Sequence, residues 1–350
     1  MNPAERAVRR FDAFQQRHLP TAFVFGVMKK YGDDNAGALT SNLAHSAIIA
    51  MFPLLLLLVT ILDLVLVGNA TARQAVLNST MGRFPLVGPD LQHNLHAMHR
   101  GSPVALAVGL AGALWGSLGL AQAGIFTMQQ VWTLPGPQRL NYLHRQARSL
   151  AFLVMLALGL IITTGLAGLG TFGQGSLGLA AAGAALSAVI NSAGFLGGFR
   201  ILTPKVVPLR HLVPGAVAGG VAWTIVQSLG VFLMGHYLHT NSAVFGMFAV
   251  VIALVAWVYL GAEITVYAAE VNVVLQRRLW PRAIAQPPLT EADQRSLAAQ
   301  AEQNQRRPEQ QVEVSFTGTP MTEDEFLRNG GEERGQSAPD RPAARHKTSG

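Results

Sequence analysis

Long apolar runs alternate with short polar stretches over the first 280 residues of the chain. Six of these runs reach the roughly 20 mostly apolar residues that a helix needs to cross the hydrocarbon core of a bilayer. They cover approximately residues 43–67, 104–128, 150–172, 177–199, 212–235 and 245–275. The pattern predicts an all-α, polytopic membrane protein built as a six-transmembrane-helix bundle.

The basic residues predict which ends of these helices lie in the cytoplasm, because Lys and Arg accumulate in cytoplasmic loops. They are frequent in the N-terminal segment, in the second–third and fourth–fifth connections, and directly after the sixth run. The third–fourth and fifth–sixth connections hold neither Lys nor Arg, and the first–second connection holds only Arg73, Arg83 and Arg100. We therefore expect both termini in the cytoplasm.

Two flanking segments differ from the apolar core, which we place at residues 37–280. In the cytoplasmic segment 1–36, Val8, Phe11, Phe14 and Phe25 alternate with Arg and Gln. This predicts an amphipathic helix that either lies on the inner leaflet or packs under the bundle. Residues 281–350 are rich in Gln, Glu, Pro, Arg and Gly. We expect them to form a disordered cytoplasmic tail, because they have too few apolar side chains to bury.

The composition supports a membrane core and narrows the range of partners. The chain is 50% hydrophobic and 13% charged, against about 25% charged in an average soluble domain. Its net charge is +7, and the basic residues lie between apolar runs. We therefore assign them to contact with the anionic lipids of the inner leaflet and expect no nucleic-acid partner. The N-terminal segment lacks the apolar stretch of a cleavable signal peptide.

Small residues recur at helical spacing and predict places where helix backbones approach closely. The residues with this spacing are Gly109, Ala113 and Ser117, Gly112 and Gly116, Gly194 and Gly198, and Gly215 and Gly219. Such faces serve either packing within one bundle or contact with a second copy. The oligomeric state therefore stays open.

Two carboxylates in the sixth run define a candidate substrate path. Glu263 and Glu270 are seven residues apart, which places them on about the same helical face, roughly 10 Å apart along the axis. An intramembrane carboxylate normally faces the bundle interior or a water-filled cavity. We expect Glu263 to face a polar cavity beside the first span, with Glu270 at its cytoplasmic end. Alternatively, Glu270 simply pairs near the inner interface, where Arg277 and Arg278 are about two turns away.

Further polar residues belong to the same candidate path. Asn42 and His45 make the cytoplasmic end of the first run unusually polar, and Asn272 follows Glu270 in the sixth run. Pro53 lies inside the first run, where the missing backbone N–H should kink or locally unwind the helix. In transporters such interrupted helices line substrate sites, although a purely structural kink fits the sequence as well.

The sequence offers no recognisable catalytic motif. It contains no Walker A loop, no HExxH and no GxSxG, and the absence of cysteine excludes disulfides and thiolate metal sites. His93, His96 and His99 are spaced three apart, but a solvated amphipathic face explains them without a metal. We expect no catalytic residue, no metal and no cofactor.

Two segments carry a resemblance to a known family. The stretch ALTSNLAHSAIIAMFP over residues 38–53 resembles the opening signature of the YihY/BrkB family. The sixth run is similar to the Trp-x-Tyr and Gly-Ala-Glu-x-Asn elements of that family through Trp257, Tyr259, Gly261, Ala262, Glu270 and Asn272. The residues before Glu270 read Ala268-Ala269, whereas the Gly-Ala-Glu string itself falls at residues 261–263. The resemblance covers about residues 20–280.

This resemblance implies a multi-pass protein of the bacterial inner membrane. Members of the family have been named virulence factors and, by an old assignment, ribonuclease BN, and some resemble candidates for moving lipid or envelope precursors. We expect a transporter or flippase-like protein whose substrate the sequence does not name. The alternatives are a non-transporting membrane scaffold and, third, a ribonuclease, although no soluble domain with paired carboxylates is present to cleave RNA.

Overall fold

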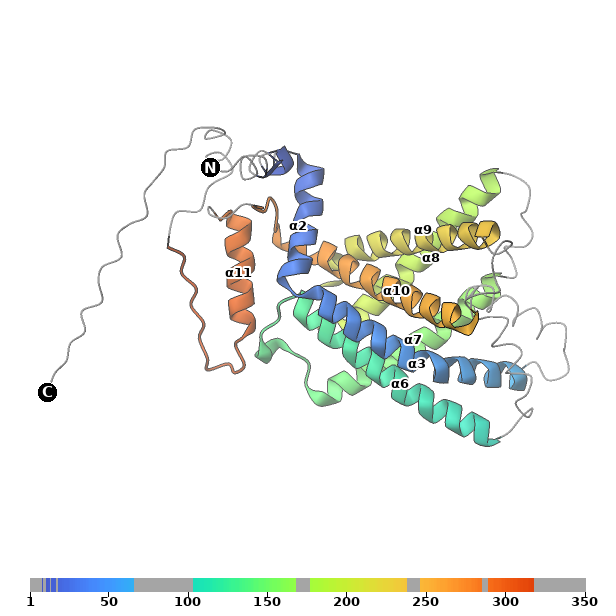
Figure 1. Ribbon diagram of the computed structural model, residues 1–350. Helices are drawn as coiled ribbons and strands as arrows, with labels where there is room; N and C mark the ends of the chain where they lie inside the picture. Colours follow the sequence, from blue (N-terminus) through green and yellow to red (C-terminus); the bar gives the residue numbers. More distant parts are fainter. Residues whose placement is uncertain are drawn as a thin grey trace.

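The computed structural model describes residues 8, 11, 12, 14–16, 18–65, 103–167, 177–237, 246–284 and 289–317 (Figure 1). All regular structure in these ranges is helical, without a strand, so the all-α prediction is confirmed for them. Six of the helices in these ranges have 25 to 32 residues, and each overlaps one of the apolar runs. They are α3 (Ala36–Val65), α6 (Pro103–Val131), α7 (Tyr142–Ala167), α8 (Leu177–Leu202), α9 (Val213–Tyr237) and α10 (Gly246–Arg277).

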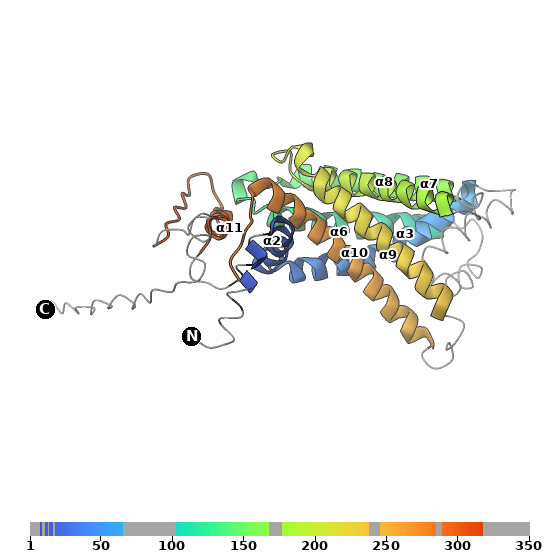
Figure 2. The same ribbon diagram turned by 90° about the horizontal axis from the view of Figure 1, so that it is seen from above.

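The six long helices form a closed ring. Each helix packs against the next one along the chain, and α10 packs against α3 to complete the circle. Because successive helices run in opposite directions, the start of α3, α7 and α9 and the end of α6, α8 and α10 lie at the same end, here called the basal end. Figures 1 and 2 show the shorter helices α2 (Leu19–Asp33) and α11 (Glu291–Gln303) placed across this basal end.

Small residues let neighbouring helices approach closely at several points. A Cβ atom added to Gly116 of α6 would lie 2.7 Å from the Cα of Ala50 in α3. A Cβ at Gly215 or Gly219 of α9 would collide with Ala268 of α10, at 1.9 Å from its backbone oxygen and 2.9 Å from its Cβ respectively. Backbone contact of this kind is how helices associate where lipid removes the hydrophobic drive between them.

The remaining small residues of the predicted stripes differ in their surroundings. A Cβ at Gly194 would meet nothing within 4 Å, and one at Gly198 would reach only ordinary contact at 3.9 Å. Gly112 is half-buried in α6, whereas the side chains of Ala113 and Ser117 and the surroundings of Gly109 lie outside the described part. The tightest contact between α8 and α9 instead involves Gly220, where a Cβ would lie 2.3 Å from the Ser192 hydroxyl.

Apolar side chains cover the outside of the ring. Two stretches in the described ranges, Ala181–Leu202 and Val251–Arg277, are long and apolar enough to cross a membrane. Only 11% and 22%, respectively, of their most apolar 18-residue segments is buried inside the protein. The core helix of a soluble protein would be mostly buried. Here large residues such as Leu186, Val189 and Ile252 are exposed on the helix surfaces. A lipid environment explains this exposure, because helices satisfy their own backbone hydrogen bonds.

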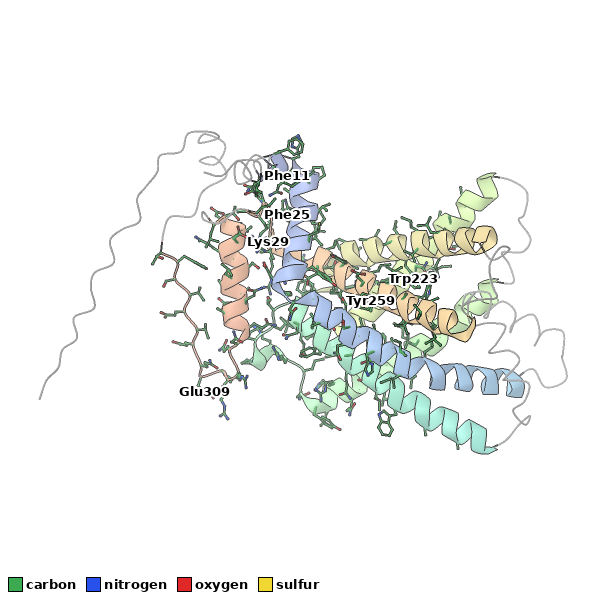
Figure 3. All side chains as sticks on the ribbon, in the orientation of Figure 1. Phe11, Phe25, Lys29, Trp223, Tyr259 and Glu309 are labelled. Atoms are coloured by element: carbon green, nitrogen blue, oxygen red, sulfur yellow. The ribbon has the colours of Figure 1, made fainter. Side chains whose placement is uncertain are left out.

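Helix α2 packs under the bundle with one face and exposes apolar residues on the other. Gly26 lies so close to the end of α10 that a Cβ would be 2.9 Å from the Leu279 carbonyl, and Phe23 meets Trp280 edge-on with ring centroids 5.5 Å apart. Val24 and Met28 are each 57% exposed on the opposite face. The helix therefore combines packing under the bundle with an outward apolar surface suited to a lipid interface. Phe25 and Lys29 mark its course in Figure 3.

The prediction of a disordered tail from residue 281 onward is wrong for residues 289–317. Thr290 caps α11 in a reciprocal capping box: its hydroxyl accepts from Asp293 N–H, and the Asp293 carboxylate accepts from Thr290 N–H. The segment orders without a large apolar core, because polar side chains attach it to the bundle, as described below. Residues 318–350 lie outside the described part of the chain.

Candidate functional site

A buried charge cluster joins α2, α6 and α10 at the basal end. The Lys30 ammonium lies 3.5 Å from a carboxylate oxygen of Glu270, and both side chains are almost completely buried, at 1% and 0% exposure. Lys30 also forms an ion pair with Asp34 and donates a hydrogen bond to the Val131 carbonyl at 3.1 Å. We call Lys30, Asp34 and Glu270 the Lys30 cluster. It connects the end of the spanning helix α10 to the peripheral helix α2.

The Lys30 cluster holds two carboxylates against one cation. Neither oxygen of Glu270 accepts a hydrogen bond from a described residue, so its ion pair with Lys30 is the contact that compensates for its burial. Burial raises the pKa of Asp34, although the charge and hydrogen bond of Lys30 oppose this shift. A buried pair of this kind is strongly destabilised when one partner is removed, because the other remains as an uncompensated charge.

Arg277 is occupied elsewhere, so it is not the partner of Glu270. Its guanidinium donates to the Trp132 carbonyl at 2.6 Å and to the Thr133 hydroxyl at 2.5 Å. These bonds attach the end of α10 to the loop that follows α6. Glu270 therefore pairs near this end of α10, as the alternative expected, but its partner is Lys30 of the N-terminal segment and not Arg277.

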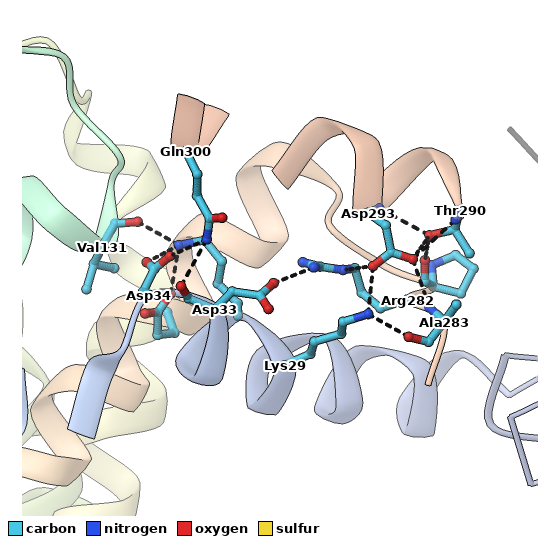
Figure 4. A network of polar contacts seen from close by, with 12 residues as sticks. Lys29, Asp33, Asp34, Val131, Arg282, Ala283, Thr290, Asp293 and Gln300 are labelled. Atoms are coloured by element: carbon cyan, nitrogen blue, oxygen red, sulfur yellow. Dashed lines mark hydrogen bonds and ion pairs between the residues drawn. The ribbon is translucent and has the colours of Figure 1, made fainter. Parts of the chain in front are cut away.

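A second set of charges attaches α11 to α2, as Figure 4 shows. The Asp293 carboxylate accepts from Lys29 at 2.9 Å, from Arg282 at 2.6 Å and from the Ala283 N–H at 3.1 Å. Arg282 also pairs with Asp33 of α2. Burial would raise the pKa of Asp293, but the Lys29 and Ala283 hydrogen bonds and the Arg282 charge outweigh it and lower the pKa to about 2. We call Lys29, Asp33, Arg282 and Asp293 the Asp293 clasp.

Helix α11 continues these contacts across the basal end. Gln300 donates to the Asp33 carbonyl at 3.1 Å and to the Asp34 carboxylate at 3.4 Å, so it connects the clasp to the Lys30 cluster. Gln303 donates to Gln130 at 2.5 Å, and the Gly136 N–H donates to the Gln305 carbonyl at 2.7 Å. The segment therefore covers the ends of α2 and α6 from the basal side.

The other predicted path residues do not gather around Glu263. Glu263 is half-buried, and its charge acts on Tyr31 and Tyr267, whose rings stack with centroids 4.2 Å apart. Asn42 and His45 are exposed. Among the described residues, Glu263 makes no hydrogen bond or ion pair. Of the two carboxylates of α10, Glu270 and not Glu263 is therefore the one with a charged partner.

Asn272 joins two helices by a hydrogen bond, and Pro53 lies within a continuous helix. Asn272 is buried, and its side-chain oxygen accepts from the Gly215 N–H at 2.6 Å, which fixes α9 against α10. Helix α3 runs without a break through Pro53 and changes direction along its length in Figure 1, while the Pro53 side chain lies outside the described part. Aromatic rings add a further α9–α10 contact, where Trp223, labelled in Figure 3, lies 5.4 Å from Trp257 between ring centroids.

Sequence reasoning missed most of the charges that build the site. Lys29, Lys30, Asp33 and Asp34 form two pairs with a spacing of four residues, which places each acid beside a base on one helical face. Thr290 and Asp293 have the spacing of a capping box. Both signals are visible in the sequence and would have predicted an ordered basal layer, although not its contact with Glu270.

An all-helical chain whose long helices are apolar and expose apolar side chains is a membrane protein. The chain belongs to the BrkB virulence factor family: the family model described as Virulence factor BrkB matches residues 27–292, well over half of its length. This confirms the resemblance found in the sequence. The match begins within α2 and ends at the start of α11, so it includes the whole Lys30 cluster.

The comparison with curated sequences gives a partial match. The chain is 32% identical over 74 residues to the ribonuclease-like protein YfkH of Bacillus subtilis (strain 168). The match covers 21% of this chain and 26% of YfkH, so the chain spans about a quarter of the length of that relative. No solved structure matches the chain.

Proposed function

We propose that all six long helices cross the bacterial inner membrane, with both termini in the cytoplasm, and that the protein moves a lipid or envelope precursor across it. The charge distribution supports this topology. Every Lys and Arg in the described residues of the six helices lies in the turns nearest the basal end: Arg145, Arg148, Arg200 and Arg277. The positive-inside rule then makes the basal end cytoplasmic.

The topology can be tested with reporter fusions. Fusions after residues 140, 206 and 285 should all report a cytoplasmic location, because residues 140, 206 and 284 lie at or beside the basal end. A periplasmic signal after residue 206 would contradict the six-span topology, whatever the protein does.

The observation that carries the transport proposal is the Lys30–Glu270 pair at the basal end of a closed ring of helices. In the proposed cycle the pair alternates between two arrangements, the paired and buried one that the structure shows and a separated, hydrated one. In the first, α2 and α10 close the cytoplasmic end of the ring. In the second, Glu270 and Lys30 face water, and Lys30 is free to pair with an anionic headgroup.

The proposed substrate is amphiphilic for two reasons. The ring exposes apolar side chains on its surface, which suit an acyl chain, whereas Lys30 supplies a cation for a phosphate or carboxylate. Glu263 lies about two turns further into the same helix and would be the next polar group along the path. The protein needs no catalytic step in this scheme.

Reconstitution in liposomes tests the transport proposal. Purified protein should move a fluorescent anionic phospholipid between leaflets faster than protein-free liposomes do, as measured by bleaching of the outer leaflet. Glu270→Gln removes the charge paired with Lys30 and should change the rate at least about tenfold. Glu291→Gln is the matched control, because Glu291 is exposed and carries only a surface pair with Arg295.

Equal rates for wild type and empty liposomes would contradict transport and favour the scaffold alternative. Equal rates for Glu270→Gln and Glu291→Gln would contradict the role of the pair. RNA enclosed with the same protein tests the third alternative, which the name of YfkH suggests: RNA should remain intact, and its cleavage would favour a ribonuclease.

A further inference from the structure

The opposite side of the basal end carries a cluster of cations without acidic partners. Four of them come from the start of α7 and the end of α8: Arg145, Arg148, Arg200 and Lys205. We call this group the α7–α8 corner. Arg148 brings its two segments together by donating to the Ile201 carbonyl at 3.0 Å and to the Thr203 carbonyl. The positive charge of Arg200 repels the positive charge of Arg148.

The sequence explains why these cations stay uncompensated. Between Asp90 and Glu263 the chain contains seven Lys and Arg residues and not a single Asp or Glu. Four described acids of the basal end, Asp33, Asp34, Glu270 and Asp293, form ion pairs with Lys29, Lys30 or Arg282 instead. No ion pair joins a described acid to the corner.

The guanidinium of Arg145 has a defined position and one nitrogen without an acceptor among the described residues. It lies over the Tyr142 ring, with its central carbon 5.8 Å from the ring centroid. Its Nε atom is buried without a hydrogen-bond partner among the described residues. A planar donor group that is positioned by an aromatic ring and lacks an acceptor is well suited to a phosphate oxygen.

Exposed apolar residues beside the α7–α8 corner indicate that the phosphate belongs to a phospholipid and is not a free anion. Leu143 is 75% exposed and Val206 is 63% exposed, next to the cations in sequence. Exposed aromatic and aliphatic side chains next to Arg and Lys are typical of the level where acyl chains meet headgroups. A free anion would gain nothing from the apolar surface, whereas a phospholipid would use both parts.

We propose that the α7–α8 corner binds the phosphodiester headgroup of an anionic phospholipid of the inner leaflet. Arg145 and Arg200 contact the phosphate, Arg148 holds the corner together through its backbone bonds, and Leu143 and Val206 contact the acyl chains. The inference rests on the membrane topology proposed above, but it does not require transport. The bound lipid supplies the negative charge that helices α6 to α9 lack.

Native mass spectrometry of the purified full-length protein in neutral detergent tests this site. Phosphatidylglycerol and phosphatidylcholine are titrated separately, and the bound fraction gives a dissociation constant for each. Each cation near an anionic surface contributes roughly 1 kcal/mol, so Arg145→Gln together with Arg200→Gln should weaken phosphatidylglycerol binding about 30-fold. Binding of phosphatidylcholine should change less than about threefold.

The matched control removes the same charge elsewhere. Arg306→Gln together with Arg307→Gln neutralises two exposed cations beyond α11 and should leave the phosphatidylglycerol affinity unchanged. Arg148 is kept in all variants, because it supports the local fold. A helical circular dichroism spectrum and an unchanged elution volume establish that each variant is folded before it is titrated.

Three results would overturn the inference. The first is equal affinity of the wild type for the two lipids. The second is an equal loss in the control variant, which would mean that net charge alone acts. The third is displacement of phosphatidylglycerol by inorganic phosphate at equal concentration, which would make the corner a general anion site. Reporter fusions test the topology separately, so a failure there is distinguishable from a failure here.

Discussion

The two sides of the basal end use charge in opposite ways. Around α2, α10 and α11, charged side chains meet partners of opposite sign within the protein, in the Lys30 cluster and the Asp293 clasp. At the α7–α8 corner Arg148 donates to backbone carbonyls and is repelled by the charge of Arg200, and Arg145 lies over an aromatic ring. The difference teaches that one side balances its charges within the protein, whereas the other keeps a net positive charge that our proposal assigns to lipid binding.

This comparison also distinguishes two roles of basic residues at the basal end. A positive-inside residue is usually interpreted as an orientation signal alone. Here Lys30 and Arg282 are buried and form ion pairs that hold helices together, while Arg145 and Arg200 form no ion pair with a described acid and are the residues we propose to bind lipid. The same sequence rule thus covers two physical roles, and only the position of the acids distinguishes them.

Replacing Lys30 should have the largest effect on stability. Lys30→Met leaves Glu270 and Asp34 buried without their cation, which should cost about 3–5 kcal/mol of unfolding free energy. Thermal unfolding in a fixed neutral detergent measures the loss. Lys205→Met removes an exposed cation of the corner and serves as control, with a change within about 0.5 kcal/mol. Equal losses in both variants would contradict the distinction between the two sides.

Removal of α11 should have the next largest effect. A chain ending at Ile284 loses Asp293, so Arg282 stays buried with only Asp33 as a partner. We expect a loss of about 1–3 kcal/mol and faster hydrogen exchange in α2. A chain ending at residue 317 keeps every described contact of α11 and should behave as the full chain. Unchanged exchange in α2 after removal of α11 would show that the clasp contributes nothing.

The clasp should weaken at acid pH. Because the pKa of Asp293 is lowered to about 2 in the folded protein, below an ordinary value of about 3.9, its contribution is complete above about pH 4. It decreases as the pH falls toward 2. Hydrogen exchange of α11 should therefore accelerate across that window. In Asp293→Asn the exchange should be faster at neutral pH and should lack this acid step, and an identical acid step in the variant would contradict the assignment.

The smallest effect is expected at the corner in the absence of lipid. Arg145→Gln together with Arg200→Gln removes like charges that repel one another, so unfolding in neutral detergent should change by less than about 0.5 kcal/mol. Added phosphatidylglycerol should raise the melting temperature of the wild type and have little effect on the variant. A large loss of stability without lipid would mean that these cations have partners within the protein.

Hydropathy and charge predicted the helices well, because a long apolar run has few alternatives to a helix in lipid. The contacts of Glu270 were not predictable in the same way, since its partner Lys30 lies in a segment far away in the sequence. The tail was misjudged on composition: residues 289–317 have few large apolar side chains, but Asp293, Gln300 and Gln303 attach the segment to the bundle through polar bonds. Local capping signals identify such segments better than hydrophobicity does.

The central claim is that the Lys30–Glu270 pair closes the cytoplasmic end and separates during transport. Ala269 is buried beside Glu270, and the chain has no cysteine, so Ala269→Cys provides a specific probe that keeps the pair intact. We measure the rate of labelling by a water-soluble maleimide in liposomes, with and without a fluorescent anionic lipid that is being moved. The account predicts labelling about tenfold faster while lipid moves, and equally slow or equally fast labelling in both states would contradict it.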